Sequence, residues 1–216
     1  MDSAIGLTPS EIELLAASAN NQPILFGNLT RKLTDETSSL LPMLEHAFLT
    51  ALQANEQEGN FFCQLQTGRS LFGIGSRSRV VIHVNGSMHA WPEPSLEASL
   101  TTLVQRLCDV EDTLTIAELI RSWLGDAAVD HLQAGLRWIF DAMAERGWVE
   151  RQIERRLDLF RLTRYDVPEA IKDFLAGYKR ESVGSAQQRS QAHTERFARI
   201  LEQELDRELR RLMLRP

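Results

Sequence analysis

The chain has 216 residues, of which 43% are hydrophobic and 25% charged, a balance that excludes a disordered or a collagen-like protein. No apolar run approaches the roughly 18 residues that cross a bilayer, and residues 1–6 lack the basic start and apolar core of a secretory signal. Two cysteines, Cys63 and Cys108, are too few for a disulfide framework, so we predict a cytoplasmic protein without a membrane partner.

The net charge of −6 is unevenly distributed along the chain. Residues 1–60 hold two basic and eight acidic side chains, whereas residues 151–216 hold fifteen basic and eleven acidic ones. Neutralising phosphates requires a concentrated basic face. An acidic body with a basic end therefore argues against general affinity for nucleic acid, but it leaves room for a local contact.

The first 60 residues carry helical patterns. Thr8 or Ser10 can cap a helix whose first turn contains Pro9, and a short apolar stretch, residues 24–26, follows this helix. A longer helix is predicted over residues 37–57, because its apolar residues recur at spacings of three and four. They are Leu40, Leu41, Leu44, Phe48, Leu49 and Leu52.

After Gly59 the pattern changes to short strands separated by polar turns. One hairpin is predicted around Thr67-Gly68, and a second around Asn85-Gly86, the strongest local hairpin signal in the chain. Pro92 and Pro94 mark a boundary after this small antiparallel sheet. The predicted strands are residues 61–65, 70–74, 80–84 and 87–91.

Helical patterns return after this boundary. The predicted elements are helices over 95–108, 115–124 and 126–146, strands over 148–153 and 157–162, and helices over 168–177 and 193–214. Gly135 is a candidate break within the third helix, and Gly147 ends it. The two strands are joined by a charged turn, Glu154-Arg155-Arg156. Small polar residues at 182–191 predict a flexible joint before the last helix.

Residues 114–163 resemble a winged-helix module. The elements occur in the right order, and Gly147-Trp148-Val149-Glu150 is similar to the entry of a wing. Residues 1–91 repeat this order, so the chain resembles tandem winged-helix proteins. These include DNA-binding regulators and the subunits that clamp the kleisin of bacterial condensin-like complexes. The candidate recognition helix, residues 133–146, carries only two cations, Arg137 and Arg146, which favours backbone contact or a protein partner over base reading.

The predicted wing supplies the candidate nucleic-acid-binding residues. They are Arg151, Arg155, Arg156 and Arg161. Guanidinium groups on a projecting hairpin can bind phosphates. The alternative is an arginine-rich surface balanced by Glu150, Glu154 and Asp158.

Other residue types do not assemble into a recognisable site. The predicted hairpin places His83 and His89 on opposite faces, and no spacing typical of zinc ligands is present. No hydrolase or metalloprotease motif occurs, so we predict a non-enzymatic protein with no catalytic residues, metal or cofactor. We expect Trp123, Trp138 and Trp148 to pack in the core rather than to form a ligand cage.

The last helix carries one apolar stripe on an otherwise charged surface. Its members are Phe197, Leu201, Leu205, Leu209 and Leu212, which are candidate partner-binding residues. A stripe of this length must be buried somewhere. It can fold back on the chain, dock on a partner or pair with its copy, and the sequence leaves all three open.

The sequence therefore predicts a mainly helical α+β protein with two winged-helix-like modules, residues 1–94 and 95–166, and a C-terminal helical arm, residues 167–216. The leading functional hypothesis is a DNA-associated regulator or adaptor that contacts the DNA backbone through the second wing. The alternative is a structural assembly subunit resembling the kleisin-binding partners. Both hypotheses imply a homodimer or a subunit of a larger complex.

Overall fold

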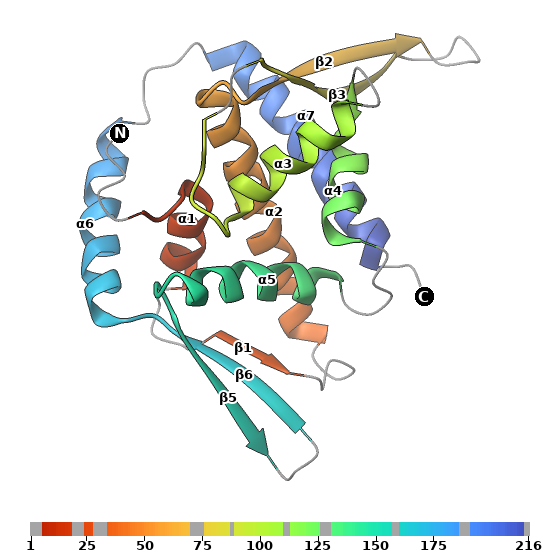
Figure 1. The fold of residues 1–216 in the computed structure, drawn as a ribbon. Helices are drawn as coiled ribbons and strands as arrows, with labels where there is room; N and C mark the ends of the chain where they lie inside the picture. The colour runs from red at the N-terminus through yellow and green to blue at the C-terminus, as the bar shows by residue number, and fades with distance from the viewer. Residues whose placement is uncertain are drawn as a thin grey trace.

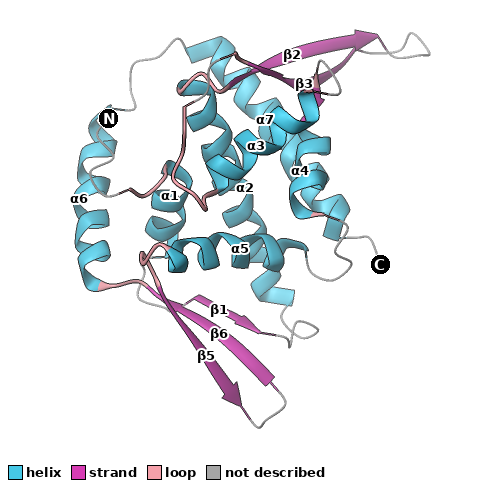
Figure 2. Ribbon diagram, in the orientation of Figure 1, coloured by secondary structure: helices cyan, strands magenta, loops and turns pink. Residues whose placement is uncertain are grey.

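The computed structural model describes residues 6–18, 24–27, 34–69, 76–86, 89–109, 113–125, 131–156, 160–185 and 191–213. Within these ranges the chain forms seven helices and two three-stranded sheets (Figures 1 and 2). The predicted class, a mainly helical α+β protein, is confirmed. In the same ranges, no helix is both long enough and apolar enough to cross a bilayer.

The elements of the first half are α1 (Pro9–Ser18), β1 (Ile24–Gly27), α2 (Thr34–Gln57), β2 (Phe61–Arg69) and β3 (Ser76–Val84). Those that follow are α3 (Leu96–Cys108), β4 (Leu114–Thr115), α4 (Ile116–Leu124), α5 (His131–Glu145), β5 (Glu150–Arg156), β6 (Phe160–Asp166), α6 (Glu169–Ser185) and α7 (Gln191–Met213). The helix predicted at residues 193–214 is thus present as α7. Residues 182–185 of the predicted joint belong to α6, and residues 186–190 lie outside the described part.

Helix α2 lies at the centre of one hydrophobic core. It packs against α1, α3, α5 and α7, and Figure 1 shows it surrounded by them. Its fully buried side chains include Leu44, Phe48 and Leu52, which belong to the stripe that predicted the helix. Burying side chains of this size contributes about 1.5–3 kcal/mol each, so this central helix stabilises both halves of the chain.

The two halves exchange a strand. β1 pairs with β6, giving the order β1-β6-β5, and β4 pairs with β3, giving the order β2-β3-β4. One of the two edge strands of each sheet, β1 or β4, therefore comes from the other half of the chain. The predicted boundary near residue 94 falls in a loop between the halves, but neither half completes its own sheet.

The predicted turns of the first sheet are wrong. Thr67 and Gly68 continue β2, where they pair with Ser78 and Arg77, and residues 70–75 lie outside the described part. The strand predicted after Asn85-Gly86 is not present at residues 89–91, since β3 pairs with β2 and β4 instead, and residues 87–88 lie outside the described part.

A side-chain interaction overrides this hairpin signal. The side-chain amide of Asn85 donates to the backbone carbonyl of Gly59 at 2.8 Å. The side chain of Asn60 accepts from the His89 amide at 2.5 Å and donates to the His89 carbonyl at 3.1 Å. Asn60 thus satisfies both backbone groups of His89, which a neighbouring strand would otherwise do.

Buried acidic residues tie α1 to the second half. The carboxylate of Glu97 accepts hydrogen bonds from the Ser10 amide at 2.8 Å and from the Ser10 hydroxyl at 3.0 Å, so it caps α1 from a distant segment. Glu11 accepts from the Thr8 amide at 2.9 Å and forms an ion pair with Arg146. Both carboxylates are fully buried and have hydrogen-bond partners, as buried charges require.

Helix α7 folds back onto the chain. Leu201, Leu205 and Leu209 are buried in the common core, and α7 packs against α2, α4 and β3. Its Glu204 carboxylate accepts from the Val80 amide at 3.0 Å, and the Nε of Arg121 lies 2.7 Å from Glu208. The structure thus selects the first of the three predicted alternatives for these leucines.

Candidate functional site

The β5–β6 hairpin starts where α5 ends. Gly147, with φ 78°, donates to the Ala144 carbonyl at 3.0 Å, and the amide of Trp148 donates to the Met143 carbonyl at 2.9 Å. This pair of bonds is the Schellman arrangement, which favours glycine at its left-handed position. The predicted role of Gly147 is confirmed, and the turn directs the chain into a hairpin that projects from the body (Figure 1).

A single carboxylate on α5 anchors this hairpin. The Oδ1 of Asp141 accepts from the Tyr165 hydroxyl at 2.7 Å and from Arg151 Nη1 at 2.8 Å, and Oδ2 lies 3.8 Å from Arg137 Nε. Burial and the bond to Asp141 raise the pKa of Tyr165 well above its usual range, so the hydroxyl remains a proton donor. Asp141 therefore engages cations of both the helix and the hairpin.

The arginines predicted to bind phosphate lie along this hairpin. Arg151, at its base, is paired with Asp141. The predicted turn at residues 154–156 is wrong, because these residues continue β5. Arg155 lies opposite Arg161, and Arg156 opposite Phe160. This register leaves three residues, 157–159, for the connection, a common hairpin length. The side chains of Arg155, Arg156 and Arg161 are outside the described part of the chain.

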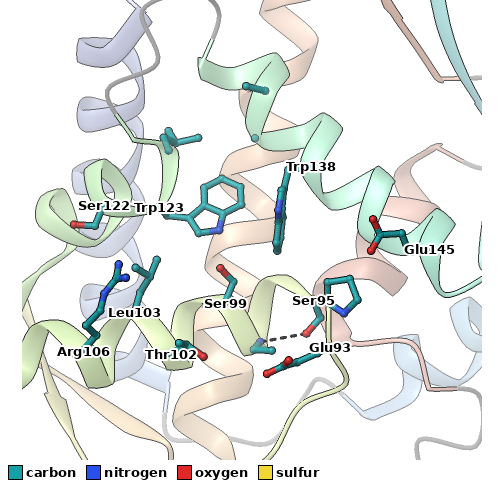
Figure 3. A pocket seen from close by; sticks show the side chains of 15 residues that line it. Glu93, Ser95, Ser99, Thr102, Leu103, Arg106, Ser122, Trp123, Trp138 and Glu145 are labelled. Atoms are coloured by element: carbon teal, nitrogen blue, oxygen red, sulfur yellow. Dashed lines mark hydrogen bonds between the residues drawn. The ribbon is translucent and has the colours of Figure 1, made fainter. Parts of the chain in front are cut away.

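A second candidate surface is a groove of about 810 Å³ between α3, α4 and α5. Figure 3 shows its two tryptophans, Trp123 from α4 and Trp138 from α5, above the smaller side chains of α3. The ring centroids of these tryptophans are 5.6 Å apart, nearly perpendicular. Trp138 is 38% exposed, so the expectation that it packs in the core is wrong. Its ring forms one wall of the groove.

Gly135 allows the tryptophan wall to form. A Cβ atom at this position would lie 2.8 Å from the Trp123 ring and 2.9 Å from the Leu124 side chain, well inside ordinary contact distance. α5 runs unbroken through this residue, so the predicted break is wrong. The glycine instead lets α5 approach α4 closely.

The ends of the groove carry opposite charges. Glu93 and Glu145 line one end, and Arg106 lines the other; Figure 3 shows them on opposite sides of the two tryptophans. Glu93 and Arg106 have no ion-pair partner among the residues the structure describes. Ser99 and Thr102 lie between the ends on α3. The sequence did not indicate this groove, which is assembled from three helices.

No cluster of three metal-ligating side chains occurs within the described ranges. Burial raises the pKa of the Cys63 thiol, so this cysteine remains protonated, a poor nucleophile. His83 stacks on Phe62 with ring centroids 4.8 Å apart.

The remaining predicted binding residues lie on α7. Leu201, Leu205 and Leu209 are buried by the chain itself, so in this structure they are not a partner-binding surface. The side chains of Phe197 and Leu212 are outside the described part of the chain. No family model, curated protein or solved structure matches the chain.

Proposed function

We propose that this protein is a non-enzymatic, DNA-associated adaptor with two winged-helix-like modules, and that the β5–β6 hairpin contacts the phosphate backbone. The observation that carries this proposal is the register at the end of the hairpin, where Arg155 faces Arg161. Like charges directly opposite each other destabilise a strand pair. An anionic ligand between them would remove this repulsion.

The charge along the hairpin supports contact at its far end. At its base, Arg151 pairs with Asp141, and Arg164 binds both carboxylate oxygens of Asp166 at 2.8–2.9 Å. The cations for a ligand would therefore be those at the end. On α5, Arg137 and Asp141 form an ion pair, which disfavours base reading. The proposal is thus binding to the backbone without sequence preference.

The test is a titration of the protein with a short random duplex. Three phosphate contacts predict that affinity falls about 40-fold between about 50 and 200 mM salt, from a slope of about −0.9 per contact. The Arg155→Ala/Arg156→Ala variant should retain one phosphate contact, so its affinity should fall only about 3.5-fold over the same range of salt concentration. A Lys172→Ala/Arg210→Ala variant removes the same charge elsewhere and should behave like the wild type. Absence of binding at low salt would refute the proposal.

A second candidate function is a structural assembly subunit, similar to the kleisin-binding tandem winged-helix proteins. The specific observation in its favour is the groove, where Trp138 is exposed between charged ends. Exposed aromatic residues in a concave surface are typical of protein interfaces. The same titration separates the candidates, because an assembly subunit requires no salt-dependent affinity for DNA.

A further inference from the structure

We infer that the groove between α3, α4 and α5 binds one amphipathic α-helix of a protein partner, and that the charges at its ends fix the direction of that helix. The inference deepens the assembly candidate and rests on it. It does not depend on the hairpin binding DNA.

The groove is about as long as a short helix. From Ser95 to Arg106 its floor follows α3, a length of about 16 Å at 1.5 Å per residue, which equals about three helical turns. Small side chains, including Ala98, Ser99 and Thr102, form this floor. A helix can therefore approach α3 at the usual interaxial distance of about 8–10 Å.

The walls supply an apolar contact. Trp138 and Trp123 line one side, with Leu103 beneath them. The Trp123 ring also packs edge-on against Phe48, at a centroid distance of 5.1 Å, which restricts its movement. An aromatic wall of this kind fits the leucine or aromatic residues that a helix presents at three- and four-residue spacings.

The charges determine direction. A helix carries partial positive charge at its N-terminus and partial negative charge at its C-terminus. Glu93 and Glu145 therefore favour the N-terminus of the bound helix at their end, and Arg106 favours its C-terminus. Side chains that complement the groove are Lys or Arg in the first turn and Asp or Glu in the last. The occupant is thus an apolar-faced helix with a basic start and an acidic end.

The test uses a displayed library of helical peptides of about four turns against the full chain, with one face and both terminal turns randomised. We expect enrichment of peptides with an apolar face, basic first turn and acidic last turn. The best peptide is then compared with a version whose terminal charges are exchanged, which should bind about tenfold more weakly, a difference of about 1.4 kcal/mol. In a Glu93→Lys/Arg106→Glu variant this preference should reverse.

A matched pair of variants locates the binding. Thr102→Trp adds a large ring at an exposed position in the groove lining and should abolish binding of the peptide. Gln105→Trp adds the same ring at an exposed position of α3 outside the groove lining and should leave binding of the peptide unchanged. Circular dichroism verifies that both fold. No enrichment, enrichment without charge polarity, or equal binding to both variants would overturn the inference. So would a wild-type dimer that Thr102→Trp converts to a monomer, since the occupant would then be a second copy. None of these outcomes changes the result expected of the DNA titration, which tests the hairpin separately from the groove.

Discussion

Replacing Gly135 with alanine tests how closely α5 packs against α4. The added Cβ would lie 2.8 Å from the Trp123 ring and 2.9 Å from the Leu124 side chain, so these groups must move by about half an ångström to restore normal contact. Trp123 is confined by Phe48 and Trp138. Overpacking of this kind destabilises by about 1–3 kcal/mol.

The helix propensity of alanine partly offsets this cost. Alanine is favoured over glycine by about 1 kcal/mol in a helix interior, so Gly135→Ala should be destabilised by about 0–2 kcal/mol overall. Gly177 in α6 is the matched control, because no atom lies within 4 Å of its added Cβ. Gly177→Ala should gain about 0.5–1 kcal/mol.

Urea unfolding of both variants, followed by far-UV circular dichroism, measures the free energy of unfolding. The difference between the two variants isolates the steric term, since both gain the same propensity. Tryptophan fluorescence reports separately on the packing around Trp123. If Gly135→Ala proved as stable as Gly177→Ala, the close approach of the helices, and the aromatic wall built on it, would be refuted.

Three further changes test the core and the hairpin anchor. Burial raises the pKa of Glu97 above its ordinary 4.5, so the folded state binds this proton more tightly, and stability falls as pH rises from about 4.5 through the folded pKa. Glu97→Gln, which keeps an acceptor and a donor for Ser10, should lose less stability over that window in urea unfolding at stepped pH. Asp141→Ala removes the acceptor of the Tyr165 hydroxyl and should cost about 1–3 kcal/mol, with faster amide exchange in the hairpin. Leu205→Ala, at a fully buried position, should cost about 2–5 kcal/mol independently of protein concentration, whereas a stripe that served dimerisation would make this loss concentration-dependent.

The end of a helix could be predicted from a local signal. Gly147 ends α5 as predicted, because a helix cap depends on residues within one turn. The pairing of the strands could not be predicted from local signals. Residues 24–26 showed an apolar stretch, but nothing nearby in sequence indicates that β1 joins β6, about 140 residues away. The Asn85-Gly86 signal predicted a hairpin wrongly, because the side chain of Asn60 binds the backbone of His89 in place of a neighbouring strand.

The two candidate surfaces show the same division between local and distant information. The apolar stripe on α7 predicted burial, but a stripe does not specify what covers it. The arginines of the hairpin were found because a basic cluster is contiguous in sequence. The groove was missed because Trp138, Glu93 and Arg106 come from separate segments. Gly135 was the one available signal, since a glycine inside a strong helical pattern often marks a close approach.

The strand exchange has a consequence for both proposed surfaces. The hairpin is joined to the first half of the chain through β1, and β4, which leads into α4, is joined to it through β3. Neither surface can move away from the body without breaking strand pairs. On α5, moreover, Trp138 and Asp141 are one turn apart, so the groove wall and the anchor of the hairpin share one helix. A helix bound in the groove would therefore be held in a fixed position relative to the hairpin.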